Sequence, residues 1–381
     1  MNTQSIGDAR MMSVKQTLSR TLASAALCLT LVAFATAQDN KDSIQLKSGA
    51  TESGKIKSED FEGVVLDGKT DKTIAWKDIQ VDGISYAGAA QYQSAKEQFA
   101  GGKLDEALKA FEELKNEKNV RPVLKQHALY YIPFILQRQG KFDQALVGYK
   151  ELLTAFPKSR YLLDVGDNYV SLFIAKKDSA GGAKAVDALA NDALTAGVDG
   201  SISAAMNVQK GRLLEDQNKY PEAQAAYTVA ERAPGVSPIV IAKAILGQGR
   251  CAIALGDKQK AEGLFRKVAN SDGPSVVLAG AWNGLGDLLL EEGRGAGAGK
   301  KADPDKILDA LYCYLRGVVQ YSPLPGDPTN EYERSLAFSA QCFEYLSQLD
   351  PKPESKASNK ARAEARKDQL RREFPNSTYL K

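Results

Sequence analysis

The sequence predicts a mainly α-helical chain, in which an α-solenoid of stacked helix pairs follows a small β-barrel-like module. Two observations predict this fold class. A six-residue turn motif recurs along most of the chain, and its copies lie at nearly constant intervals. Before the first copy, short alternating apolar runs are separated by turn residues, which is the pattern of strands.

Residues 1–37 have the features of a secretory signal peptide. They begin with basic residues, continue in an apolar run over 22–35, and end in the small-residue sequence A-T-A. That run is too short for a membrane-spanning helix. We therefore expect cleavage after Ala37, export to the periplasm, and a mature chain without a transmembrane span.

Residues 38–87 form the expected β module. Its strand signals are about ten residues apart, which predicts a curled sheet or small barrel of about five strands. The sequences D-S-I-Q-L-K-S-G (42–49), G-K-I (54–56) and I-A-W-K-D-I (74–79) resemble the Sm-like and SH3-like barrels. The segment lacks the aromatic and arginine platform on which nucleic-acid bases stack. We expect an adaptor or capping module.

Residues 88–349 form the expected solenoid, with a period of about 38 residues. Ala107 and Ala145 are 38 residues apart, Ala223 and Ala261 are 38 apart, and the 78 residues between Ala145 and Ala223 leave room for one degenerate unit over 160–200. These alanines close the recurring turns G-K-L-D-E-A (102–107), G-K-F-D-Q-A (140–145), N-K-Y-P-E-A (218–223) and G-D-K-Q-K-A (256–261).

Two further positions recur in most units. An aromatic residue follows the alanine by four positions, and a small residue precedes it by twelve. A sixth unit begins with W-N-G-L-G at 282–286 and resumes at Ala310 and Tyr314. The aromatic residues are Phe111, Tyr149, Tyr227 and Phe265, and the small residues are Ala95, Gly211 and Gly249.

This pattern resembles the tetratricopeptide repeat. The resemblance implies helix pairs that bury their apolar faces against neighbouring pairs and bind protein segments on the wall made by the first helices. Two departures put regular curvature in doubt: Pro133 occupies the small position of the second unit, and the third unit lacks the aromatic. The heptapeptides at 156–162 and 374–380 are similar to hairpin closures of bacterial envelope tetratricopeptide proteins.

Two segments interrupt or end the solenoid. Residues 293–306 are glycine-rich, which predicts a flexible insertion within the sixth unit. Residues 350–381 contain a charged helix that we interpret as a solvated cap.

The sequence contains no pattern typical of catalysis. A single histidine, His127, has no catalytic motif around it, and no spacing suits a metal, so we predict no enzyme, cofactor or metal. The cysteines Cys251, Cys313 and Cys342 lie far apart in apolar stretches, so buried free thiols are favoured over a disulfide. The net charge of +3 gives no electrostatic reason to bind nucleic acid.

The candidate site is therefore a partner-binding groove along the first helices. Arg212 and Arg250 occupy the same position in adjacent units, so they either converge on one carboxylate of a partner or pair with Glu215, Asp216 or Asp287 on the same surface. The candidate groove residues are Tyr92, Lys96, Phe99, His127, Tyr130, Phe134, Arg212, Arg250, Asn283 and Asp287.

The predicted function is a non-enzymatic scaffold or adaptor of the bacterial cell envelope that binds envelope proteins or peptide segments. The alternative is a module that binds an envelope polymer, peptidoglycan, through the basic C-terminal helix or the β module.

Overall fold

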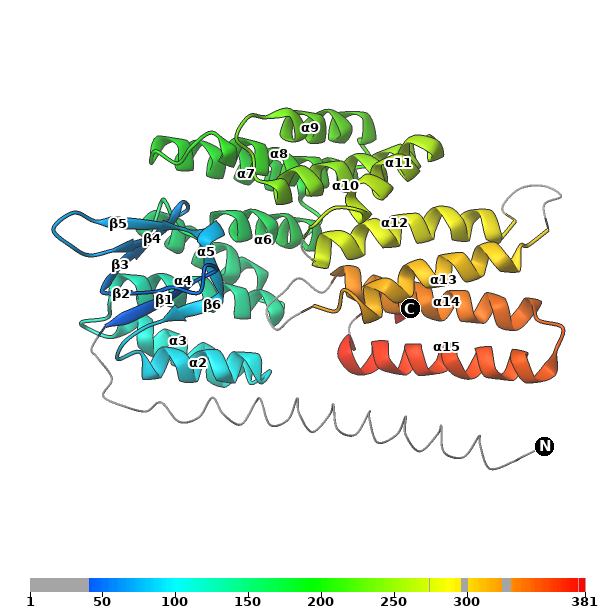
Figure 1. Ribbon diagram of the computed structural model, residues 1–381, viewed down its shortest axis with the longest axis horizontal. Coiled ribbons are helices and arrows are strands. Elements are labelled where there is room, and N and C mark those ends of the chain that lie inside the picture. The colour runs from blue at the N-terminus through cyan, green and yellow to red at the C-terminus, as the bar shows by residue number, and fades with distance from the viewer. Residues whose placement is uncertain (1–40, 274, 296–300, 324–329, 376, 381) are drawn as a thin grey trace, which may run out of the picture. The chain divides into compact units, whose positions relative to one another are not determined.

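The computed structural model describes residues 41–273, 275–295, 301–323, 330–375 and 377–380, and it confirms the mainly helical fold (Figure 1). The predicted signal peptide and the centre of the predicted insertion, residues 296–300, lie outside the described residues. The chain divides into two compact units. The first contains the chain up to Ile56 together with Leu66–Ala89, and the second contains Lys57–Val65 together with Ala90–Lys381.

The first unit contains an antiparallel sheet with the strand order β2-β1-β6. Ile44 of β1 is opposite Ile84 of β6, and its side chain is fully buried. The buried carboxylate of Asp42 accepts hydrogen bonds from the backbone N–H groups of Ile56 at 2.6 Å and Ala87 at 2.8 Å. The predicted strands are therefore present, whereas closure into a barrel stays a prediction. The strands are β1 (Asp42–Leu46), β2 (Thr51–Gly54), β3 (Ile56–Glu59), β4 (Gly63–Leu66), β5 (Lys72–Ala75) and β6 (Ile79–Ser85), with the 3-10 turn η1 (Trp76–Asp78) before β6.

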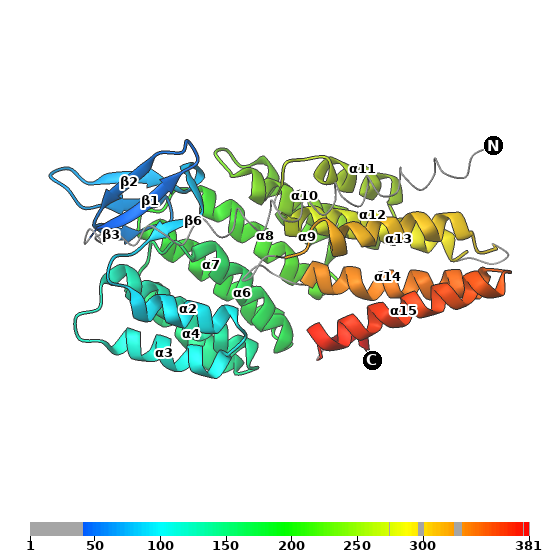
Figure 2. The same ribbon diagram turned by 60° about the horizontal axis from the view of Figure 1, so that its bottom comes forward.

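The described part of the second unit contains fourteen α-helices, which form seven consecutive pairs (Figures 1 and 2). The sequence predicted about six units and a capping helix, and the structure joins the last two helices into a seventh pair. The first four pairs are α2 (Ala90–Ala100) with α3 (Leu104–Asn116), α4 (Pro122–Arg138) with α5 (Phe142–Ala155), α6 (Leu162–Ala175) with α7 (Ser179–Thr195), and α8 (Ser201–Asp216) with α9 (Tyr220–Arg232). The last three are α10 (Pro238–Ala254) with α11 (Lys258–Ala269), α12 (Ser275–Gly293) with α13 (Pro304–Val319), and α14 (Asn330–Leu349) with α15 (Pro353–Glu373), followed by the 3-10 turn η2 (Thr378–Leu380).

The recurring turn motif works through a left-handed residue at its first position. Gly102, Gly140 and Gly256 have φ values of 75°, 76° and 82°, and Lys177 and Asn218 adopt φ values of 58° at the equivalent positions. This conformation lets the following N–H group donate back to the end of the first helix, as in a Schellman cap. The degenerate third unit therefore keeps the turn although it has lost the sequence motif.

The predicted aromatic positions form the contacts between neighbouring pairs. Tyr227 of α9 is fully buried between Gly211 of α8 and Gly247 of α10. A Cβ atom added at these glycines would lie 2.6 Å and 2.3 Å from the tyrosine ring, so neither position has room for a side chain. The recurring glycine and aromatic positions of the sequence are thus the residues through which neighbouring helix pairs pack together.

The second and third units fill the contact between their two helices with different residues. Pro133 in α4 faces Gly148 of α5, where an added Cβ would lie 2.9 Å from the proline Cβ. In the third pair, Val186 of α7 is fully buried in the aromatic position. An added Cβ at Gly182 would lie 2.8 Å from the Cβ of Phe173, so an aromatic residue of the first helix occupies the space instead.

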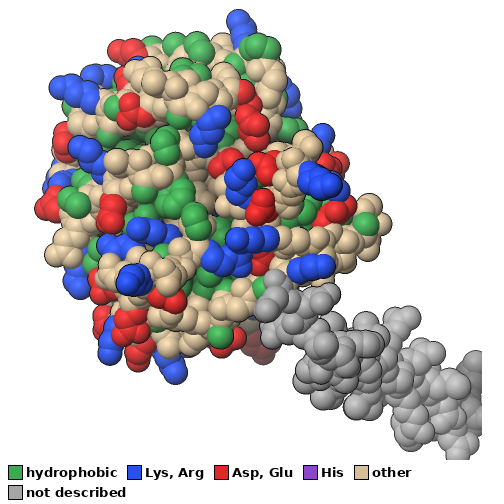
Figure 3. Space-filling model, turned by 90° about the vertical axis from the view of Figure 1, so that its left-hand side faces the viewer, with side chains coloured by type: hydrophobic (Ala, Val, Ile, Leu, Met, Phe, Trp, Pro, Cys, Tyr) green, Lys and Arg blue, Asp and Glu red, His purple; other side chains and the backbone are tan. Residues whose placement is uncertain are grey.

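The surface of the chain is mixed in charge. On the face drawn in Figure 3, Lys and Arg side chains are interspersed with Asp and Glu side chains. Within the described residues, no helix combines the length and the apolar character that crossing a membrane requires.

Candidate functional site

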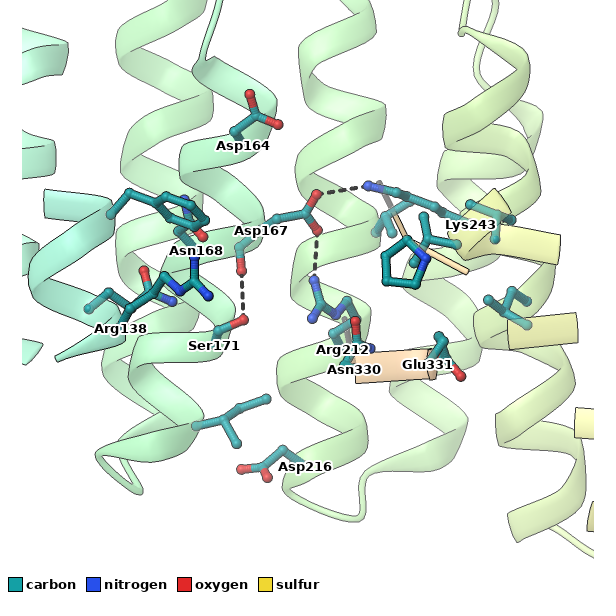
Figure 4. Close-up of a pocket in the computed structure, with 18 of the residues that line it drawn as sticks. Arg138, Asp164, Asp167, Asn168, Ser171, Arg212, Asp216, Lys243, Asn330 and Glu331 are labelled. Atoms are coloured by element: carbon teal, nitrogen blue, oxygen red, sulfur yellow. Dashed lines mark hydrogen bonds and ion pairs between the residues drawn. The ribbon is translucent and has the colours of Figure 1, made fainter. Parts of the chain in front are cut away.

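The second unit contains a groove of about 1130 Å³ along its first helices (Figure 4). Helices α4, α6, α8 and α10 supply most of its lining, and residues of α2, α12 and α14 complete it. The volume lies slightly above the range of about 300–1,000 Å³ for small-molecule sites, which suits an extended segment.

A simple register describes which side chains of α6 and α10 reach the groove. Counting back six, ten and thirteen residues from the left-handed turn residue gives Ser171, Asp167 and Asp164 on α6. The same count from Gly256 gives Arg250, Leu246 and Lys243 on α10, and all six residues line the groove. Because these positions recur every three or four residues, they lie on one face of each helix.

The centre of the groove is a charge network around Asp167. Its carboxylate accepts from Arg212 at 2.7 Å, from Lys243 at 2.8 Å, and from the Gln209 amide at 3.0 Å, so that α6, α8 and α10 meet at one side chain (Figure 4). Burial opposes ionisation of Asp167, but the charges of Lys243 and Arg212 outweigh it and hold the pKa of this carboxyl below its usual value. The network is therefore ionised at neutral pH.

A second ion pair lies one unit further along. Arg250 donates to Glu215 through Nε at 2.9 Å and through a terminal nitrogen at 3.2 Å. The same terminal nitrogen lies 3.4 Å from the Tyr227 hydroxyl. Both predicted arginines are thus paired within the chain. Arg250 binds Glu215, as one alternative proposed, whereas Arg212 binds Asp167, a partner that was not among those expected from the sequence.

Asp164 differs from the other acidic residues at the centre of the groove. It is exposed to the groove, and no ion pair or hydrogen bond of its side chain occurs among the described residues. Surrounding protein displaces water, and Asp167 adds repulsion, so the pKa of Asp164 is raised to about 6. The charges of Lys243 and Arg160 lower this pKa but do not outweigh burial and the repulsion from Asp167.

One end of the groove is aromatic. Tyr130 stacks on Phe134 with ring centroids 5.7 Å apart, and Phe99 lies 5.8 Å from Phe134. The guanidinium of Arg138 lies 5.5 Å from the centre of the Phe99 ring. The three predicted residues Phe99, Tyr130 and Phe134 therefore line the groove together.

The other five predicted residues do not line it. Tyr92 is buried, and Lys96 lies with its ammonium 5.8 Å from the centre of the Tyr92 ring. Asn283 is fully buried and donates to the backbone oxygen of Glu331 at 2.9 Å. Asp287 accepts from Tyr314 and Arg334. These contacts are packing contacts within and between helix pairs.

His127 belongs to a buried cluster that also includes part of the β3–β4 hairpin. Its Nδ1 is 2.5 Å from the Tyr161 hydroxyl, and its Nε2 is 3.5 Å from the Glu59 carboxylate. Arg160 pairs with the same carboxylate at 2.6 Å, and Gln126 donates to the Glu59 backbone oxygen at 2.9 Å. Burial lowers the pKa of His127 to about 4, so the ring is neutral at pH 7.

Asp164, Asp167 and Lys243 line the groove but were not predicted from the sequence. The sequence nevertheless contains a signal for them, because the count back from the turn residue that gives Arg250 also gives these three residues. Two of them belong to the third unit, where the aromatic position is absent and the register is therefore hard to recognise.

The described residues offer little for other chemistry. Among them, no group of three His, Cys, Asp or Glu side chains could hold a metal ion. Cys251, Cys313 and Cys342 are buried and not disulfide-bonded, and burial raises the pKa of each thiol, to about 12, 11 and 12. The groove, with its paired charges and aromatic end, is suited to binding a polar segment.

Comparison with known families supports the register. The tetratricopeptide repeat family matches residues 127–159 and 243–273. Each match begins thirteen residues before a left-handed glycine, Gly140 or Gly256, so both start at the same position of the unit. No curated protein matches the sequence.

Similar solved structures include two that are described as tetratricopeptide repeat proteins. The Pseudomonas aeruginosa protein pilF is 17% identical, with 67% of this chain and 94% of that chain covered and a TM-score of 0.37. A tetratricopeptide repeat protein from Parabacteroides merdae is 16% identical, with 76% and 96% covered and a TM-score of 0.41. The C-terminal part of such a protein from Cytophaga hutchinsonii is 13% identical, with 76% and 97% covered and a TM-score of 0.38.

Proposed function

We propose that this chain, which contains tetratricopeptide repeats, is a non-enzymatic scaffold that binds an extended segment of a partner protein in the groove. The observation that carries the proposal is the continuity of the groove over the first helices of successive pairs. A segment lying there would contact several units at once.

The chemistry of the groove indicates what the segment carries. Asp167 pairs with both Arg212 and Lys243, and Glu215 pairs with Arg250, so both arginines already have a partner within the chain and are not free to clamp a partner's carboxylate. Asp164 lines the same groove and forms no salt bridge within the described residues, so its carboxylate is available to a partner. We therefore expect a segment with a basic side chain near Asp164 and an apolar side chain at the aromatic end.

In-cell photocrosslinking tests the groove. A crosslinking amino acid at Ser171, which is exposed in the groove, should give defined protein adducts, and one at Asp192 on the outer helix α7 should not. Asp164→Lys should abolish the adducts made from Ser171, whereas Asp192→Lys should leave them unchanged. Equal adducts from both crosslinking positions would remove the support for a groove partner.

We also propose that the protein acts in the bacterial periplasm. The support comes from the sequence of residues 1–37, with its basic start, apolar run and small-residue end. The mass of the protein purified from cells should correspond to a chain beginning at Gln38, and fractionation should release it with the periplasm. An intact mass that includes residues 1–37 would contradict export by cleavage.

The basic C-terminal helix α15 packs as part of the solenoid, and this structural role requires no polymer ligand. Ala363 and Leu370 of α15 are buried against α13 and α14, and Lys367 pairs with Glu344 of α14. The peptidoglycan alternative therefore gains no support from α15.

A further inference from the structure

Helix α13 has a continuous apolar stripe on its outer surface. Leu308, Tyr312 and Val319 are 36%, 58% and 74% exposed, and the half-buried Leu315 lies between the last two. We call these four residues the α13 stripe. Their spacing of four, three and four residues is that of one coiled-coil seam.

The stripe is unusual within this chain. Among the described residues, every other helix has at most one exposed large hydrophobic side chain, such as Val147 on α5 or Val229 on α9. Single exposed apolar residues are normal on protein surfaces, whereas a contiguous apolar face indicates an interaction site. Figures 1 and 2 show α13 packed between α12 and α14. The exposure of the stripe residues places them on the part of the α13 surface that these two helices do not cover.

The charges beside the stripe indicate its partner. Asp305 and Asp309 lie along one side of it in the first half of the helix, and Arg316 and Gln320 continue the same line in the second half; all four are exposed. Two copies of α13 that pair antiparallel about a two-fold axis would place Asp309 of each beside Arg316 of the other. In such a pair Asp309 and Arg316 are complementary, and the two-fold axis repeats this pair of opposite charges twice.

Arg316 is already ordered for this contact. Its guanidinium lies over the Trp282 ring, 4.1 Å from the centroid, and it donates to Gln320 at 3.4 Å. Holding the side chain in place before association reduces the entropy lost on binding. We propose that the α13 stripe is the interface of a homodimer, in which two copies of this chain pair through antiparallel α13 helices.

Sedimentation equilibrium of the chain from Gln38 onward tests the dimer. The wild type should show a concentration-dependent dimer mass, and Tyr312→Glu should reduce it twofold to the monomer mass, because a carboxylate would be buried in the seam. Val229→Glu changes a comparably exposed side chain, 57%, on another helix and should leave the dimer intact. A monomeric wild type, or a Tyr312→Glu variant that keeps the dimer mass, would overturn the proposal.

A charge swap tests the antiparallel geometry. Asp309→Arg alone places two arginines together, Arg316→Asp alone places two aspartates together, and each should shift the equilibrium towards monomer. The double variant restores opposite charges across the two-fold axis and should recover the dimer. Circular dichroism confirms that each variant is folded, since Arg316→Asp also loses the Trp282 contact. Folded double variants that remain monomeric would overturn the antiparallel pairing.

Discussion

His127 shows how burial of one side chain couples stability to pH. Its side chain is 2% exposed and stacks on Tyr92 with ring centroids 4.9 Å apart. The folded pKa of about 4 lies below the unfolded value of 6.5, so the unfolded chain binds the proton more readily. Stability from this group is fully present above pH 6.5 and is lost as the pH falls towards 4.

We expect the free energy of unfolding to decrease as the pH falls through this window. The decrease should be about 1.4 kcal/mol per pH unit and about 3 kcal/mol in all from this group. Urea unfolding at a series of pH values measures it. His127 is the only histidine, so His127→Gln should flatten the dependence between pH 6.5 and 4. Asp164 acts in the opposite direction. Because its pKa is raised in the folded chain, the folded chain binds a proton more readily than the unfolded chain, and this group adds stability as the pH falls. Equal slopes in wild type and variant would show that His127 does not titrate with unfolding.

At the scale of single residues, the sequence predicted which residue types lie in the groove better than it predicted which residues pair with each other. It identified Arg212 and Arg250 as a repeated pair and named Glu215 among their possible partners, but it did not identify Asp167, the partner of Arg212, which belongs to the degenerate unit. A partner in another helix pair depends on how neighbouring pairs are rotated. Local spacing does not contain that information.

At the scale of helices, the contact between pairs depends on glycines that allow an aromatic ring to approach. Phe265 of α11 repeats the arrangement of Tyr227: Gly249 and Gly284 face its ring, and added Cβ atoms would lie 2.5 Å from it. Successive pairs are therefore joined by one buried ring set between two glycine-bearing helices. This close approach holds the first helices, and hence the groove, in register.

Two glycine-to-alanine substitutions distinguish the need for space beside the aromatic ring from the effect of glycine on helix propensity. Gly247→Ala would place a methyl group 2.3 Å from the Tyr227 ring and should destabilise the fold by about 1–3 kcal/mol. Gly263 lies in the interior of α11, where an added Cβ would meet open space, so Gly263→Ala should stabilise the fold by about 0.5–1 kcal/mol. Thermal unfolding of both variants gives the comparison. A Gly247→Ala variant as stable as the wild type would mean that the two helices can separate without penalty.

The sequence predicted the helix pairs wherever the turn and the aromatic position are both present. Where one was lost, as in the third unit, periodicity located the pair but not its groove residues. The pairing of α14 with α15 was not predicted, because the charged helix within residues 350–381 was interpreted as a solvated cap. Pro353 is the first residue of α15, a position that tolerates proline.

At the scale of the whole chain, stability should be local, because each helix pair contacts mainly its neighbours. Helix α15 supplies Ala363 to a cluster with Phe343 and Tyr314, and Leu370 to a cluster with Leu336. It therefore covers the apolar faces of the sixth and seventh pairs, as a terminal cap of a solenoid does. Its main contacts within the described residues are with α14.

Truncation after Asp350 removes α15 and should destabilise only its end of the solenoid. Burial of a leucine such as Leu370 contributes about 1.5–3 kcal/mol, so local opening of α13 and α14 should become easier by at least that amount. Hydrogen exchange of the truncated chain should then show lost protection in α12–α14 and unchanged protection in α4–α7, which serves as the internal control. Loss of protection throughout would mean that the solenoid unfolds as one cooperative unit, so that the groove lining supplied by α4 and α6 also depends on the C-terminal cap.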